Sequence, residues 1–113
     1  MPPSARERIE SDPTSTDLFD GVVRILEQLG DYAIEEKQTS LHVTHGRAFL
    51  GLHPRKAGLL VNIVTERQLD PERMHKTEQV SSRRWHNEIL LKVPADIDED
   101  LRLWIAEAYS LTV

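Results

Sequence analysis

The sequence predicts an α+β domain, with an antiparallel sheet of four to five strands and N- and C-terminal helices packed on one face. Three observations lead to this prediction. Apolar residues recur at helical spacing near both ends of the chain. Between these ends, apolar and polar residues alternate as they do in strands. The alternating stretches are separated by short segments with glycine or proline, which is typical of an antiparallel meander, and terminal helices around such a sheet define an α+β arrangement.

The composition limits the class of protein. A chain of 113 residues fits one domain, and 39% hydrophobic with 29% charged residues is ordinary for a globular protein. No apolar run approaches the roughly 20 residues of a membrane helix, and residues 1–8 lack the apolar core of a secretory signal. The chain has no cysteine, which excludes disulfides, thiolate metal sites and a cysteine nucleophile.

The N-terminal third predicts an arm followed by a helix. Residues 1–15 are polar and contain three prolines, so we expect a flexible or loosely docked arm, with a short helical turn over residues 6–10 as the alternative. Residues 16–113 then form the domain. A helix is predicted over residues 17–29 because Leu18, Val22, Ile25 and Leu29 share one face, with Ser15 or Thr16 as its cap.

Strands are predicted over residues 32–37, 41–44, 47–53, 59–65 and 86–93. Residues 59–65 alternate most clearly and put Leu60 and Val64 on the face away from the helices. Leu50 and Leu52 of the preceding strand are expected to share that face. An apolar outer face suggests a dimer surface, a partner surface or a pocket wall.

Two segments complete the expected layout. Residues 66–84 are polar and irregular, with a short helix proposed at residues 70–74. A final helix is predicted over residues 97–110, capped by Asp96, with Glu99 at the capping-box position.

Charge is divided unevenly along the chain. The formal net charge is −5, yet residues 37–92 contain ten Lys and Arg against five Asp and Glu, so this part is +5 and the flanks together −10. Such asymmetry indicates an anionic partner for the basic part. The alternative is that a basic sheet and acidic helices neutralise one another in the fold.

The most distinctive cluster is residues 81–88, SSRRWHNE. Two guanidinium groups, an indole and an imidazole here could hold a phosphate or carboxylate and stack a planar ring. Basic residues at the predicted strand ends could converge with them. The candidate ligand-binding residues are therefore Arg47, Arg55, Lys56, Arg83, Arg84, Trp85 and His86. The structural alternative is that Trp85 fills the edge of the core while the arginines pair with acidic residues of the helices.

Patterns for other chemistry are missing. The chain has no Gly-x-Ser-x-Gly elbow and no glycine-rich phosphate loop. A metal site needs three or four converging ligands, whereas His42 and His45 would point to opposite faces of a strand. Because these motifs are absent, the sequence predicts no catalytic residue, no metal and no cofactor.

Three stretches resemble signatures of a known bacterial family: residues 47–60 (RAFLGLHPRKAGLL), residues 82–86 (SRRWH) and residues 96–109 (DIDEDLRLWIAEAY). Together they are similar, in the same order, to the family of the domain of unknown function 5655, sometimes labelled a predicted transport protein. The resemblance covers about residues 17–112. It implies an α+β domain in a cytoplasmic bacterial protein and carries over no catalytic residue.

These observations favour a non-enzymatic binding or interaction module, expected as a homodimer, for an anionic small molecule or nucleic acid. Two alternatives remain open. One is a small enzyme acting on an anionic substrate, with His86 as general acid or base and Glu88 orienting it. The other is a purely structural homodimer that pairs through the apolar outer face of its sheet.

Overall fold

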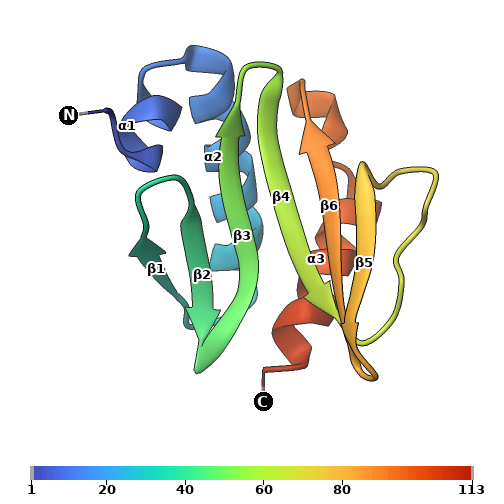
Figure 1. Ribbon diagram of the computed structural model, residues 1–113. Helices are drawn as coiled ribbons and strands as arrows, with labels where there is room; N and C mark the ends of the chain where they lie inside the picture. The colour runs from blue at the N-terminus through green and yellow to red at the C-terminus, as the bar shows by residue number, and fades with distance from the viewer. Residues whose placement is uncertain (1, 113) are drawn as a thin grey trace.

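The computed structural model describes residues 2–112 and contains one antiparallel sheet of six strands in the order β1-β2-β3-β4-β6-β5 (Figure 1). The strands are β1 (Ala33–Glu36), β2 (Leu41–His45), β3 (Arg47–Arg55), β4 (Gly58–Thr65), β5 (Lys76–Ser81) and β6 (Arg84–Leu91). The helices are α1 (Ala5–Glu10), α2 (Pro13–Glu27), the 3₁₀ turn η1 (Pro94–Asp96) and α3 (Glu99–Ser110). The α+β prediction is confirmed, with six strands rather than four to five.

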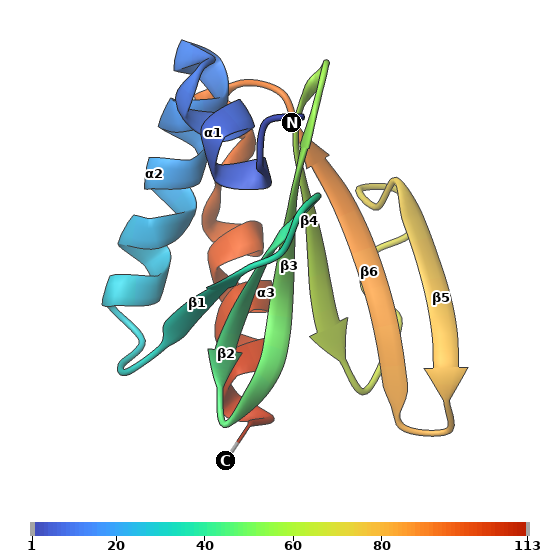
Figure 2. The same cartoon turned by 60° about the vertical axis from the view of Figure 1, so that its left-hand side comes forward.

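All three α-helices lie on one face of the sheet, as Figure 2 shows. The core fills the space between the two layers. It is built from fully buried side chains of both, among them Leu18, Val22, Leu26, Leu41, Val43, Leu52, Val61, Ile63, Leu91, Leu101 and Ile105. The opposite face carries no helix in the part of the chain that the structure describes. No helix among these residues is both long and apolar enough to cross a membrane.

The N-terminal segment is more ordered than its composition suggests. Helix α1 begins with a capping box between Ser4 and Glu7, and its Ala5 and Ile9 are buried on one face. Helix α2 begins at Pro13, four residues before the predicted start, because the Asp12 carboxylate accepts a hydrogen bond from the Ser15 amide at 3.1 Å. Most of residues 2–15, expected as an arm, is therefore helical, and the alternative of a helical turn over residues 6–10 is confirmed by α1. Met1 lies outside the described residues.

Three other boundaries differ from the expected ones. Helix α3 is capped by Asp98, whose carboxylate accepts from the Leu101 amide at 3.0 Å. Asp96 instead accepts from the amide of Val93 at 3.2 Å, and holds the turn after β6. Residues 70–74 form a turn and not the proposed short helix.

A β-bulge in β3 decides which side chains face the helices. Val43 pairs with Leu50 and Thr44 with Ala48, so the intervening Phe49 is an extra residue in β3. Beyond the bulge Leu50 lies opposite Ile63, a buried residue of the helix-facing side of β4. The prediction that Leu50 and Leu52 lie on the outer face is therefore wrong, whereas Leu60 and Val64 do lie there.

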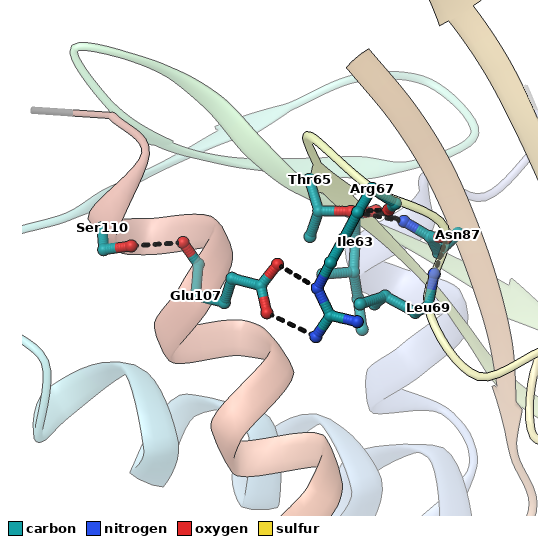
Figure 3. Close-up of polar contacts among 7 residues, drawn as sticks. All are labelled: Ile63, Thr65, Arg67, Leu69, Asn87, Glu107 and Ser110. Atoms are coloured by element: carbon teal, nitrogen blue, oxygen red, sulfur yellow. Dashed lines mark hydrogen bonds and ion pairs between the residues drawn. The ribbon is translucent and has the colours of Figure 1, made fainter. Parts of the chain in front are cut away.

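The segment between β4 and β5 is fixed to the helix side of the sheet (Figure 3). The Arg67 guanidinium donates to both Glu107 carboxylate oxygens of α3, at 2.8 and 3.0 Å. The fully buried Asn87 side chain of β6 accepts from the Leu69 amide at 2.9 Å and donates to the Ile63 carbonyl at 3.0 Å. These contacts leave the outer face of β6 uncovered by this segment.

Candidate anion site on the outer face of the sheet

A cavity of about 420 Å³ lies where β3 begins, β4 ends and the β5–β6 turn approaches them. We call it the basic cavity because three arginines line it: Arg47, Arg83 and Arg84. The remaining lining residues are Ala48, Val64, Thr65, Glu66, Ser81 and Leu111. The antiparallel order of the strands brings these distant parts of the sequence to one end of the sheet.

The three arginines differ in their contacts. Arg47 donates to the Leu111 carbonyl at 2.6 Å, and Arg83 lies 3.6 Å from a Glu66 carboxylate oxygen with 82% of its side chain exposed. Arg84 makes no side-chain hydrogen bond or ion pair with any residue of the described chain. A guanidinium has five N–H donors in a fork that matches phosphate and carboxylate groups. Arg84 is therefore the side chain of the cavity with the most unused binding capacity.

A second, smaller cavity of about 190 Å³ adjoins the first on the outer face. We call it the histidine cavity because it is lined by His42, His53 and His86, together with Leu50, Gly51 and Asn62. Both cavities share Ala48, Val64 and Arg84 as lining residues. The two cavities therefore meet at Arg84.

Asn62 and His86 form the polar part of the histidine cavity. The Asn62 amide nitrogen lies 3.4 Å from His86 Nδ1. Asn62 Oδ1 and His86 Nε2 are both buried without a hydrogen-bond partner in the part of the protein that is described. Burial lowers the pKa of His86, and the nearby Arg84 lowers it further against the opposing effect of Glu78 and Glu88.

His53 lies beside Gly51, at the floor of the histidine cavity. A Cβ atom at position 51 would come within 3.1 Å of His53 Nε2, so the glycine leaves room for the imidazole ring. Burial lowers the pKa of His53, and the positive charge of Arg55 adds to this effect while Glu88 opposes it. The lowered pKa values favour the neutral form of both His53 and His86.

These lowered pKa values predict that acid destabilises the fold. A histidine whose pKa is lower in the folded state binds fewer protons there than in the unfolded chain. Its contribution to the unfolding free energy is therefore complete above the ordinary pKa of about 6.5 and declines as the pH falls below that value. Substituting His53→Gln and His86→Gln should therefore flatten the loss of unfolding free energy between about pH 7 and 5. Urea unfolding at each pH measures this, with the exposed His75→Gln as control. An unchanged pH dependence in both variants would contradict the expectation.

The predicted site residues lie in three places: at the basic cavity or next to it, at the other end of β3, and, for Trp85, on the helix side of the sheet. Arg47, Arg83 and Arg84 meet in the basic cavity, and His86 lies next to it. Arg55 and Lys56 line a different cavity with Arg8, at the other end of β3. Since β3 has nine residues, its two ends are about 26 Å apart. Arg55 and Lys56 thus do not converge with the other arginines.

Trp85 is also separated from the arginines. It pairs with the buried Thr65 of β4, while its neighbours Arg84 and His86 point to the outer face. Trp85 lines neither the basic cavity nor the histidine cavity. Stacking of a ligand ring on this indole is therefore not supported by its placement.

His86 and Glu88 share the outer face, as their spacing predicts. The hydrogen-bond partner of His86 Nδ1 is nevertheless Asn62, and no hydrogen bond joins His86 to Glu88 among residues 2–112. Glu88 is not part of the histidine cavity. The arrangement gives His86 an amide neighbour and not the carboxylate that would orient a general base.

Three cavity residues were missed by the reasoning from sequence: His42, His53 and Asn62. These residues are grouped by the register of the strands, since Gly51 pairs with His42 on one side and with Asn62 on the other. Within residues 2–112, no three His, Asp or Glu side chains come together in a way that could hold a metal ion.

Comparison with known proteins identifies the family of this chain, but no individual protein that is significantly similar to it. The model of the family described as Domain of unknown function (DUF5655) matches residues 7–112. No curated protein and no solved structure matches the chain significantly. The match extends ten residues further toward the N-terminus than the sequence resemblance and takes in part of α1.

Proposed function

This chain belongs to the DUF5655 family, and we propose that it is a non-enzymatic binding module that takes an anionic ligand in the basic cavity. The observation that carries the proposal is Arg84, which borders both cavities and uses none of its donors within the described chain. Arg47 and Arg83 add positive charge to the same cavity. Charge-assisted hydrogen bonds from such a group are stronger than neutral ones and suit phosphate or carboxylate.

Glu66 is an acidic residue in the lining of the basic cavity. Its carboxylate already lies 3.6 Å from Arg83, and both side chains lie at the surface. Surface ion pairs of this kind contribute about 1 kcal/mol or less. An incoming phosphate can therefore compete with Glu66 for Arg83 at small cost, while Arg84 binds it without any such exchange.

A compact anion fits the charge distribution better than a long nucleic acid. The basic side chains at the two ends of β3 do not form a continuous track, and the net charge of the whole chain is −5. Nucleic-acid binding depends on neutralising many phosphates along such a track. We therefore assign the ligand to small phosphorylated or carboxylated molecules, in the cytoplasm that the family resemblance implies.

Binding of phosphate, pyrophosphate and citrate by calorimetry at low ionic strength tests the proposal. We expect Arg84→Gln to weaken the tightest of these by about tenfold or more, because a hydrogen bond to a charged group contributes about 1.5–3 kcal/mol. Arg55→Gln removes the same charge at the other end of the sheet and should have little effect. No binding by wild type, or equal weakening in the two variants, would refute the site.

The homodimer stays a prediction of the sequence. Its expected interface was the apolar outer face, yet Leu50 and Leu52 belong to the core, which leaves Leu60, Val64 and Leu90 there with the polar cavities. Sedimentation velocity across a range of concentrations measures the oligomeric state.

A further inference from the structure

The histidine cavity contains a hydrogen-bonding pair that nothing in the described chain satisfies. Asn62 Nδ2 can only donate, so His86 Nδ1 at 3.4 Å accepts and the imidazole proton is on Nε2. This leaves Asn62 Oδ1 as an unused acceptor and His86 Nε2–H as an unused donor, both buried. Turning the amide over exchanges the two roles and still leaves one donor and one acceptor.

A buried donor and acceptor without partners destabilise the protein until something binds them. Their complement is a group with an acceptor and a donor on one edge, and the edge of a nucleobase has this arrangement. The surroundings suit a planar ring, since the floor is Gly51 and the walls include the imidazoles of His42 and His53. Imidazole rings stack on bases.

The basic cavity adjoins the histidine cavity at Arg84, so a single ligand can reach both. Arg84 and His86 are two residues apart on β6 and point to the same face, so their Cα atoms are about 7 Å apart. This separation is on the scale of that between the base and the phosphate of one nucleotide. We propose that the two cavities together bind a nucleoside monophosphate, with its base against Asn62 and His86 and its phosphate on Arg84. The inference rests on the proposed function and names the class of its ligand.

The test compares ligands that share a phosphate and differ in the base. We would titrate the protein with the 5′-monophosphates of adenosine, guanosine, cytidine and uridine, and with ribose 5-phosphate, by calorimetry. At least one nucleotide should bind about tenfold or more tightly than ribose 5-phosphate, since the base satisfies two buried groups. The same nucleotide should shift the His86 Nε2 resonance in wild-type protein, and ribose 5-phosphate should not.

Variants assign each part of the ligand to its cavity. Asn62→Leu, which keeps the size of the side chain, should reduce nucleotide affinity to that of ribose 5-phosphate and leave ribose 5-phosphate unchanged. Arg84→Gln should weaken both ligands. Gln79→Leu, an exposed amide on β5, is the matched control. If Asn62→Leu does not fold, the His86 resonance in wild type decides the question.

The outcomes separate this inference from the function on which it rests. If ribose 5-phosphate binds as tightly as every nucleotide, the base does not occupy the histidine cavity, and the anion-binding function stands alone. If nucleotides bind more tightly but neither Asn62→Leu nor the His86 resonance responds, the base lies elsewhere and the inference is overturned. If no phosphorylated ligand binds, the inference is overturned, and the proposed function is overturned with it only if citrate also fails to bind.

Discussion

Gly58→Ala is expected to destabilise the fold by more than about 4 kcal/mol, which is exceptional for one added methyl group. Gly58 has a φ of +152°, a conformation that side chains rarely adopt, and its added Cβ would lie 1.9 Å from the Leu91 carbonyl oxygen. That oxygen cannot move away easily, because Leu59 and Leu91 are paired and both β4 and β6 are interior strands of the sheet. Relieving the clash would require β4 and β6 to separate at this end.

Gly46→Ala is the matched control for this prediction. Gly46 also has a positive φ, +79°, but an added Cβ would meet nothing within 4 Å. Only the backbone strain remains, about 1–2 kcal/mol. Chemical denaturation of both variants measures the difference. Similar unfolding free energies for the two would contradict the close packing of Gly58 against β6.

Asn87→Ala is expected to lower the unfolding free energy by about 3 kcal/mol. Its side chain is fully buried and bonds to the Leu69 amide, the Ile63 carbonyl and the Thr65 hydroxyl at 2.9–3.0 Å (Figure 3). Alanine leaves these groups without the partner, and an unsatisfied buried polar group costs about 1–3 kcal/mol. Asn62→Ala, which loses one contact of 3.4 Å, should cost much less.

A second measurement locates the effect of Asn87→Ala. Leu69 is fully buried and its amide is held by Asn87, so the variant should release the segment between β4 and β5. Hydrogen exchange should become faster at residues 66–75 before it does in β4. If the variant unfolds within about 1 kcal/mol of wild type and this segment stays protected, the structural role assigned to Asn87 is wrong.

Much of the fold follows from periodicity. The alternation in residues 59–65 correctly separates Leu59, Val61 and Ile63 from Leu60, Asn62 and Val64, because a two-residue period allows only one assignment of faces. Terminal helices on one face, and the antiparallel strands predicted over residues 41–44 and 47–53, are confirmed for the same kind of reason. These elements bury a regular stripe of side chains, and the stripe is visible in the sequence.

The elements that were missed, or predicted only as an alternative, bury too little to leave a pattern. Strand β5 is an edge strand in which only Thr77 is even partly buried, so its residues look like a loop. Helix α1 has six residues and buries only Ala5 and Ile9. Its signal was local, in the capping box of Ser4 and Glu7.

The bulge at Phe49 explains why the site was only partly predictable. A hairpin without the bulge would place His42 opposite Leu50, and the observed one places it opposite Gly51. One extra residue reverses every later side chain of the strand. The cluster of arginines could be found from charge alone, but the grouping of His42, His53 and Asn62 depends on this shift in register.

The central claim is that anions bind in the basic cavity, and amide chemical-shift mapping of a phosphate titration tests it most directly. We predict saturable shifts at residues 47–48, 65–66 and 81–84, with the Arg84 Nε resonance among the largest. In Arg84→Gln the same backbone shifts should need about tenfold or more phosphate to reach saturation, and in Arg55→Gln they should be unchanged. Shifts centred on Arg8, Arg55 and Lys56, or no saturable shifts at all, would contradict the claim.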